Sequence, residues 1–156
     1  MRISSLEAYG VHPDLTHAWI REYGEELLPI QERAVVEGDV LRGGSVVGVG
    51  PTGCGKTLIA EMAALHAATR GRRAIYLAPT KALAEAVYAH FRHAYGPLGV
   101  GVEISTRDRR GSDVRMLRGD FDVMVTVPEK LWSVMLEAPG LVVTVGALVV
   151  DELQLV

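Results

Sequence analysis

The chain alternates short apolar runs, rich in β-branched residues, with longer segments in which apolar residues recur at helical spacing. Few polar residues interrupt the apolar runs, which predicts strands that are buried on both faces. Strands that alternate with helices predict a parallel sheet with helical crossovers. We therefore expect an α/β fold, an open, mostly parallel sheet with helices on both faces. The strands are expected at 45–50, 74–79, 101–106, 122–127 and 147–152.

Helical spacing and local stop signals predict three helices between these strands, at 56–70, at 81–95 and from Pro128 to just before Pro139. Gly71 and Gly96-Pro97 end the first two. Pro128 suits a first helical turn, where its missing N–H costs nothing. Ligands of such sheets bind at the carboxyl ends of strands, so the segments that follow the strands are the candidate sites. Arg70, Arg72 and Arg73 lie at the opposite end and are interpreted as charges at a helix C-terminus.

Composition and charge are ordinary for one domain of 156 residues, with 49% apolar and 22% charged residues. No run of eighteen apolar residues is present, so we expect neither a transmembrane helix nor a membrane partner. The N-terminus lacks the apolar core of a signal peptide, so the expected location is cytoplasmic. The net charge of −3 argues against a surface that binds nucleic acid by bulk electrostatics, although it allows local basic patches.

The pattern G-x-x-x-x-G-K-[ST] occupies residues 50–57, between an expected strand and an expected helix. Glycines remove side chains where phosphate oxygens must approach backbone N–H groups, and the positive end of the helix faces the anion. Lys56 would reach the β- and γ-phosphates, and the Thr57 hydroxyl would bind Mg²⁺. The pattern predicts a site for ATP and Mg²⁺; the alternative is a glycine-rich structural turn. Its residues are Pro51, Thr52, Gly53, Cys54, Gly55, Lys56 and Thr57.

A pair of acidic residues follows the last expected strand, in "ALVVDELQ" at 147–154. The four apolar residues carry the chain through the core and deliver Asp151 and Glu152 at the carboxyl end of the strand. Asp151 would hold Mg²⁺, and Glu152 would orient and deprotonate the attacking water. A solvated acidic strand end is the alternative. We expect Lys56 and Asp151 to act on the same magnesium-bound nucleotide.

These motifs together resemble the first RecA-like domain of superfamily 2 helicases, in the DExH branch that includes the Ski-type RNA helicases and the archaeal repair helicases. The resemblance implies a partial RecA-like ATP-binding domain at 27–156, preceded by a helical lead-in region at 1–26. It also implies that Gln31 reads adenine. Four more segments carry the resemblance: "LLPIQERAV" at 27–35, "APTKALAEAV" at 78–87, "STRDRR" at 105–110 and "TVPEKL" at 126–131.

Three positions depart from the pattern of these helicases. Gln154 stands where most of the branch has a histidine that couples the ATP site to a second domain. Glutamine keeps a donor and an acceptor, so coupling through Gln154 is expected. Arg107 replaces the usual glycine of a Thr-Gly-Asp element, and Thr126 stands one place earlier than in the commoner "TPEK".

The resemblance implies a nucleic-acid partner, single-stranded or partly duplex, and the local chemistry agrees. Two expected helices open directly after strands, and each offers backbone N–H groups and a positive dipole end to a phosphate. Such contacts hold a backbone without reading bases, so binding is expected to be independent of sequence. Arg107, Arg109 and Arg110 follow a third expected strand and form either a further cluster that contacts phosphates or a solvated polar loop. Tyr76 lies in the middle of an expected strand and is expected in the core. The expected contact residues are Pro79, Thr80, Lys81, Arg107, Pro128, Glu129 and Lys130.

Two parts of such helicases are not found in this sequence. One is a strand with a Ser-Ala-Thr-type motif, which lies between the strands equivalent to 45–50 and 147–152. The other is a second RecA-like domain, whose arginines contribute about 10³–10⁵ to the rate. We therefore expect weak ATP–Mg²⁺ binding, little hydrolysis and no unwinding by this chain. We also expect the strands at 45–50 and 147–152 either to lie apart in the sheet or to be neighbours in an order that differs from that of the family.

The expected function is thus the ATP-binding part of a nucleic-acid-dependent ATPase and helicase. A nucleotide- or nucleic-acid-binding module that does not hydrolyse ATP is the alternative. A small-molecule kinase would need a lid with arginines after the second acidic residue, and the sequence leaves no room for one.

Overall fold

The computed structural model describes residues 1–106 and 111–153, which form two compact units, Met1–His66 and Ala67–Val156. The predicted boundary at residue 27 stays a prediction. Among the described residues, no helix has the length and apolar content needed to cross a bilayer. The first unit contains the 3₁₀ helices η1 (Ile3–Tyr9) and η2 (Val40–Arg42), the helices α1 (Pro13–Tyr23) and α2 (Pro29–Val36), and most of α3 (Lys56–Thr69).

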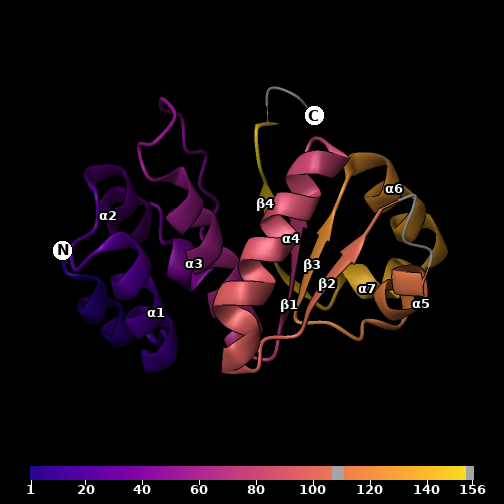
Figure 1. Cartoon of the computed structure of the whole chain (residues 1–156), viewed down its shortest axis with the longest axis horizontal. Helices are drawn as coiled ribbons and strands as arrows, with labels where there is room; N and C mark the ends of the chain where they lie inside the picture. The colour runs from indigo at the N-terminus through magenta and orange to yellow at the C-terminus, as the bar shows by residue number, and fades with distance from the viewer. Residues whose placement is uncertain (107–110, 154–156) are drawn as a thin grey trace. The chain divides into compact units, whose positions relative to one another are not determined.

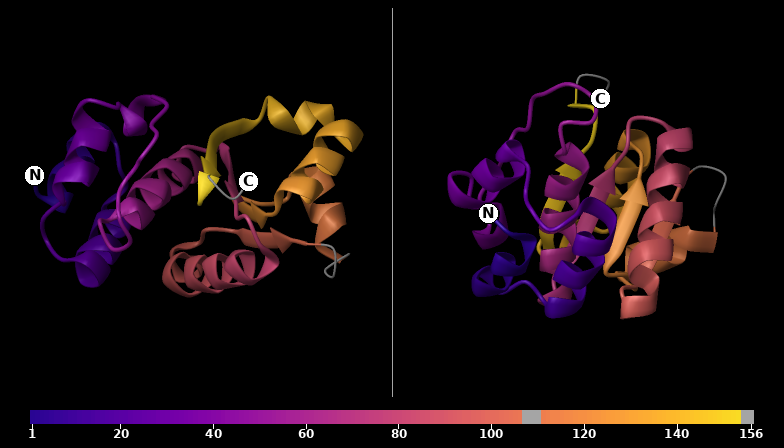
Figure 2. Two further views of the ribbon diagram at one scale, coloured as in Figure 1. Left: turned by 90° about the horizontal axis from the view of Figure 1, so that it is seen from above. Right: turned by 60° about the vertical axis from the view of Figure 1, so that its left-hand side comes forward.

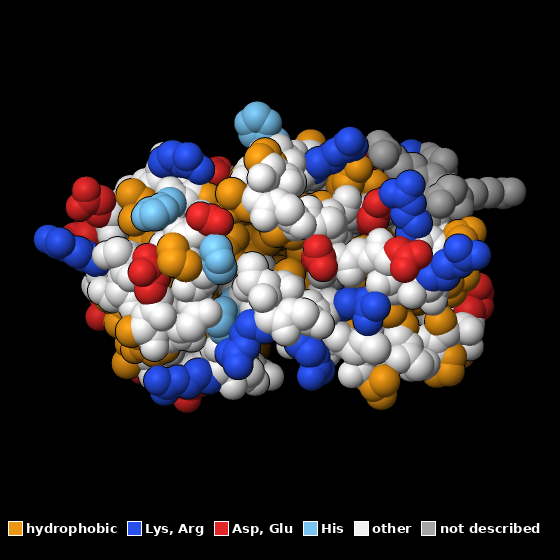
Figure 3. All heavy atoms as spheres, turned by 90° about the horizontal axis from the view of Figure 1, so that it is seen from below, with side chains coloured by type: hydrophobic (Ala, Val, Ile, Leu, Met, Phe, Trp, Pro, Cys, Tyr) orange, Lys and Arg blue, Asp and Glu red, His pale blue; other side chains and the backbone are white. Residues whose placement is uncertain are grey.

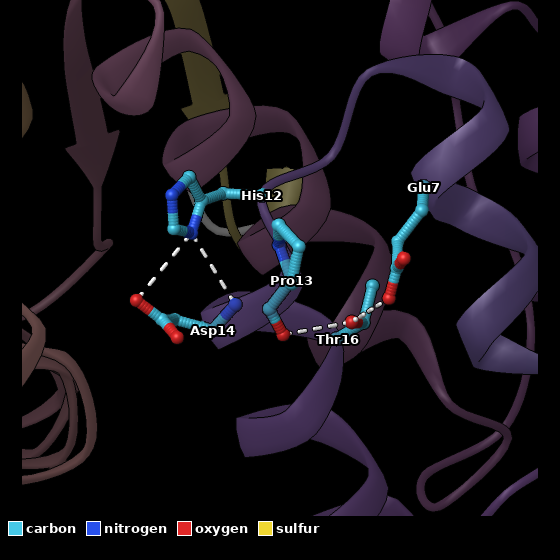
Figure 4. Close-up of polar contacts among 5 residues, drawn as sticks. All are labelled: Glu7, His12, Pro13, Asp14 and Thr16. Atoms are coloured by element: carbon cyan, nitrogen blue, oxygen red, sulfur yellow. Dashed lines mark hydrogen bonds and ion pairs between the residues drawn. The ribbon is translucent and has the colours of Figure 1, made fainter.

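Polar contacts fix the start of α1 against η1 (Figure 4). Pro13 takes the first helical position, and His12 Nδ1 accepts a hydrogen bond from the Asp14 backbone N–H at 3.3 Å. Thr16 is buried, and its hydroxyl donates to Glu7 Oε1 at 2.9 Å. A buried hydroxyl needs such a partner, so this contact holds the two helices together.

The lead-in region is also bound to α2 and α3, the helices on either side of the loop 50–57. The Met1 ammonium lies 2.7 Å from Glu32 Oε2 of α2. The Tyr23 hydroxyl of α1 donates to Oε1 of the buried Glu61 of α3 at 2.9 Å. Residues 1–26 therefore support α2 and α3 rather than forming a separate tail.

The prediction of a strand at 45–50 is wrong, because these residues do not adopt strand structure. The side chains of Val47 and Val49 are 77% and 85% exposed, so the segment buries neither of them. Backbone N–H and C=O groups of a strand need a neighbouring strand to complete the ladder, and the described part of the chain gives this segment none. The helix that follows it, α3, begins at Lys56 as predicted.

The second unit holds an open, fully parallel sheet in the order β2-β3-β1-β4 (Figure 1). This confirms the predicted fold class and four of the five predicted strands. The order places the two strands that precede the predicted nucleic-acid loops, β1 and β3, side by side. The strands are β1 (Arg73–Leu77), β2 (Val102–Ser105), β3 (Val123–Thr126) and β4 (Val145–Val150).

Helices cover both faces of this sheet (Figure 2). On one face lies α4 (Lys81–Tyr95), which is followed by the 3₁₀ turn η3 (Gly96–Leu98). The Phe91 ring of α4 meets the Tyr76 ring of β1 edge to face, with centroids 5.7 Å apart. Both rings are buried, so they anchor α4 to the sheet.

The other face carries α5 (Gly111–Arg118), α6 (Pro128–Glu137) and α7 (Pro139–Val142), of which α5 was not predicted. Met124 of β3 points to this face because neighbouring residues of a strand alternate between faces. It forms a buried apolar cluster with four residues of the surrounding helices and loops: Met116, Phe121, Val134 and Leu141.

Among the residues that the structure describes, the amino ends of the strands carry no continuous basic surface. In the view onto these ends, cationic and acidic side chains of the second unit are interspersed (Figure 3). The Arg73 guanidinium donates to the Gly119 carbonyl at 2.7 Å and the Arg72 guanidinium to the Val145 carbonyl at 3.3 Å. These two arginines therefore bind loop and strand carbonyls, which corrects their interpretation as charges at a helix C-terminus.

Candidate functional site

The fold of the loop at 50–57 favours glycine at three positions. Gly55 adopts a φ of +97°, in the left-handed region. A Cβ there would also lie 2.5 Å from Gln31 Nε2, and a Cβ on Gly50 would lie 2.7 Å from Cys54 Sγ. Gly53 has a φ of +81°, so it too favours glycine. The glycine spacing of the motif is thus required by the fold of the loop.

Lys56 places its ammonium inside the curve of this loop. Nζ donates to the carbonyls of Gly50 at 2.8 Å and Pro51 at 2.9 Å, and it lies 3.8 Å from Cys54 Sγ. Lys56 is also the first residue of α3, so the positive end of the helix dipole adds to its charge. Thr57, the next residue, is exposed. The loop and helix start concentrate positive charge and backbone donors in one place, which is the chemistry of an anion site.

Gln31 lies beside the loop as the motif order predicts. Its side chain is buried, with Nε2 donating to the Gly55 carbonyl at 3.0 Å and Oε1 accepting from the Leu28 N–H at 2.8 Å. The amide therefore links the start of α2 to the loop. These two bonds leave one N–H and one lone pair of the amide that could contact adenine. The predicted role of Gln31 in binding adenine stays a prediction.

Two helix N-termini lie together at the carboxyl edge of the sheet in the second unit. Thr80 caps α4, with its hydroxyl accepting from the Leu83 N–H at 3.3 Å, and Lys81 begins the helix. Pro128 begins α6 directly after β3, with Glu129 in its first turn. Because β1 and β3 are neighbours and parallel, the two helix starts are adjacent. The arrangement brings together six predicted contact residues: Pro79, Thr80, Lys81, Pro128, Glu129 and Lys130.

Asp151 follows β4 at this same edge. Its backbone N–H donates to the Leu77 carbonyl at 3.0 Å, which extends the ladder between β1 and β4 by one position. The carboxylate is half-buried and accepts one hydrogen bond on each oxygen, from the Tyr76 hydroxyl at 3.0 Å and from the Glu152 N–H at 2.9 Å. Glu152 is exposed and has a φ of +48°, so the chain turns sharply there.

Tyr76 is a member of this site that the sequence analysis did not find. Its predicted place in the core is confirmed, because the residue is 3% exposed. Its hydroxyl nevertheless reaches Asp151. The available signal was a tyrosine instead of a phenylalanine in a buried apolar strand, since a buried phenol usually finds a hydrogen-bond partner.

Four predicted residues lie outside the described residues: Arg107, Arg109, Arg110 and Gln154. The residue before the first of them, Thr106, is buried, and its hydroxyl has no hydrogen-bond partner among the residues that the structure describes.

The side chains that could bind a metal ion suit magnesium, which also takes ligands from substrate and water, better than a metal bound by protein side chains alone. Within residues 1–106 and 111–153, no group of three or more His, Cys, Asp or Glu side chains is arranged to hold a metal ion. Magnesium is usually held by one or two carboxylates together with substrate phosphates and water. A single oriented carboxylate such as Asp151 fits that mode of binding.

Three curated relatives align with most of this chain. The ATP-dependent DNA helicase Hel308 of Pyrobaculum calidifontis is 42% identical over 128 residues, and Hel308 of Pyrococcus abyssi is 37% identical over 139 residues. The DExH-box ATP-dependent RNA helicase DExH15, chloroplastic, of Arabidopsis thaliana is 31% identical over 154 residues. The alignments cover 82%, 88% and 86% of this chain, but only 17%, 19% and 12% of the relatives.

Two solved structures share the fold. The DUF1998 helicase MrfA, in a crystal structure with DNA and AMPPNP, superposes with a TM-score of 0.75 at 25% identity, covering 92% of this chain and 21% of MrfA. A hypothetical ATP-dependent RNA helicase from Sulfolobus tokodaii superposes with a TM-score of 0.65 at 21% identity, over 93% of this chain and 42% of that one. The second likeness concerns the fold alone.

The family model of the DEAD/DEAH box helicases matches residues 28–156. That match spans the glycine loop, the two helix starts at the carboxyl edge and the acidic pair after β4. The chain belongs to the DEAD/DEAH box helicase family.

Proposed function

We propose that this chain is the ATP-binding part of an ATP-dependent nucleic-acid helicase of the DExH branch, and that ATP–Mg²⁺ binds at the loop 50–57. The observation that carries the proposal is the position of the Lys56 ammonium, which the Gly50 and Pro51 carbonyls hold within the loop at the head of α3. The DExH15 relative, a DExH-box helicase, supports the branch.

Different groups of the site bind the nucleotide and take part in hydrolysis. The loop N–H groups and the start of α3 bind the phosphates, and Lys56 contacts the β- and γ-phosphates. Thr57 and Asp151 would hold the magnesium ion, which would neutralise charge on the phosphate oxygens. Glu152 accepts a proton from the attacking water. Gln31 reads adenine, and Gln154 couples the site to a second RecA-like domain.

Nucleic acid is the proposed partner of the carboxyl edge in the second unit. The starts of α4 and α6 offer backbone N–H groups to phosphates, with Lys81 and Lys130 adding charge. Arg107, which lies outside the described residues, is a further proposed contact. Such contacts bind single-stranded or partly duplex nucleic acid without sequence preference. The support from relatives is general: the Hel308 proteins are DNA helicases, DExH15 is an RNA helicase and the MrfA structure contains DNA.

Hydrolysis by this chain alone is proposed to be slow. The chain spans less than a fifth of the curated relatives named above, so unwinding belongs to a larger protein. Nucleotide binding without hydrolysis is the second candidate for this chain itself. It is favoured by the exposed Val47 and Val49, because the described part of the chain gives the segment that leads into the loop no neighbouring strand.

Binding of a fluorescent ATP analogue to the wild type and to Lys56→Ala tests the proposal. Loss of a charge-assisted contact worth about 1.5–3 kcal/mol should weaken nucleotide binding by at least about tenfold. Lys81→Ala is the matched control: it should leave nucleotide binding unchanged and weaken binding of a labelled single-stranded DNA or RNA. Unchanged nucleotide binding in Lys56→Ala would place the nucleotide elsewhere and contradict the proposal.

A further inference from the structure

The register of the sheet directs Tyr76 toward Asp151. Tyr76 of β1 pairs with Val149 of β4, two residues before Asp151. Residues i and i+2 of a strand point to the same face, and the Asp151 N–H continues the ladder to Leu77, so Tyr76, Val149 and Asp151 share one face. The phenol spans the two-residue offset and donates to Asp151 Oδ2 at 3.0 Å.

Aromatic packing fixes the phenol in this direction. The Tyr76 ring lies edge to face against Phe91 at an interplanar angle of 71°, and Phe91 packs in the same way on Tyr95, with centroids 5.4 Å apart. All three rings are buried. A side chain that is closely packed on α4 cannot rotate freely, so the hydroxyl is a fixed donor rather than an occasional one.

The carboxylate is held from two sides. Its second oxygen, Oδ1, accepts from the Glu152 N–H at 2.9 Å, at the turn where Glu152 has a φ of +48°. One donor on each oxygen fixes the rotation of the carboxylate plane. A carboxylate has about four lone-pair positions, so each oxygen keeps a position for a further ligand.

We propose that Tyr76 is a positioning residue of the magnesium site: its hydroxyl orients the Asp151 carboxylate so that the remaining lone pairs meet the metal ion or its bound water. The inference rests on the proposed function, in which Asp151 holds magnesium. Hydrogen-bond partners that orient a ligand in this way typically change metal affinity about 10- to 100-fold when removed.

Affinity for a fluorescent ATP analogue, measured on the full chain with and without Mg²⁺, tests the inference. Tyr76→Phe removes only the hydroxyl and should reduce the gain in affinity from Mg²⁺ by about tenfold, while the metal-free affinity is unchanged because the loop 50–57 is intact. Asp151→Asn should abolish the gain, and adding Tyr76→Phe to it should have no further effect. Tyr88→Phe is the matched control, because it removes a hydroxyl of α4 that Arg92 contacts at 3.0 Å.

The outcomes separate the inference from the proposed function. If Asp151→Asn removes the gain from Mg²⁺ and Tyr76→Phe keeps it, the positioning role is wrong and the proposed magnesium site stands. If Asp151→Asn keeps the gain, the magnesium site is wrong and the role of Tyr76 falls with it. A Tyr76→Phe variant that also loses metal-free affinity would show a purely structural role and overturn the inference.

Discussion

Individual residues of the phosphate loop were predictable because their chemistry is local. A φ of +97° at Gly55 and the close approach of Gln31 explain why glycine stands there, and the pattern 50–57 already contains that information. Lys56 likewise lies where the motif places it. The Tyr76–Asp151 contact was not predictable in this way, because it depends on how two strands 75 residues apart align.

Gly55→Ala should destabilise the chain and weaken nucleotide binding. The new Cβ requires a left-handed φ and meets Gln31 and Leu28 at 2.5 and 2.8 Å, which together cost about 1–3 kcal/mol in the free energy of unfolding. Gly48→Ala is the control, because a Cβ there meets nothing within 4 Å. Urea unfolding of both variants provides the measurement. Equal stability of the two variants would contradict the described loop.

At the scale of elements, the sequence predicted the strands that form clear apolar runs and the helices with clear stop signals. The strands β1, β2 and β3 are apolar runs that are almost wholly buried. The strand β4 is only partly buried, with Leu148 56% exposed, so the prediction of burial on both faces is wrong for it. The helix α4 runs from Lys81 to Tyr95 as predicted. The segment 45–50 is equally apolar, yet a strand also needs a neighbour to pair with, which no local pattern reveals. The helix α5 was missed because its sequence, "GSDVRMLR", is short and mostly polar.

Amide hydrogen exchange should distinguish the apolar segment 45–50, which forms no strand, from the apolar segments that form β1 and β3. The amides of 45–50 should exchange at nearly unprotected rates, because no strand among the described residues pairs with them and Val47 and Val49 are exposed. The amides of β1 and β3, which are paired and buried, should be protected by orders of magnitude. Protection of 45–50 equal to that of β1 would mean that the segment is a strand after all.

Met124 should dominate the packing of the sheet face that α5, α6 and α7 cover. Met124→Ala opens a cavity in the buried cluster and should lower the free energy of unfolding by about 2–5 kcal/mol. Met135→Ala makes the same chemical change at a residue of α6 that is 42% exposed, and should cost less than about 1 kcal/mol. Thermal or urea unfolding compares the two; similar losses would contradict the assignment of the core.

At the scale of the whole molecule, the family is established and the activity is inferred. The match to DEAD/DEAH box helicases covers residues 28–156, whereas the chain represents 17% of its Hel308 relative from Pyrobaculum calidifontis. The joint action of Lys56 and Asp151 on one nucleotide, the cytoplasmic location and the partner domain stay predictions.

Slow turnover of ATP is expected of this chain. Without arginines from a second domain, hydrolysis should fall about 10³–10⁵ below that of a complete helicase. A continuous phosphate-release assay with and without single-stranded RNA or DNA measures this rate. Stimulated release at the rate of a complete helicase would show that this chain already contains the full catalytic machinery.

The central claim is that the loop 50–57 binds the phosphates of ATP, and the backbone amides of that loop report on it most directly. In ¹H–¹⁵N NMR spectra, ATP with Mg²⁺ should shift the amide signals of Gly53, Gly55, Lys56 and Thr57 in a saturable way. Adenosine, which has no phosphates, should leave them in place. Saturable shifts confined to other residues, with these four amides unmoved, would contradict the account.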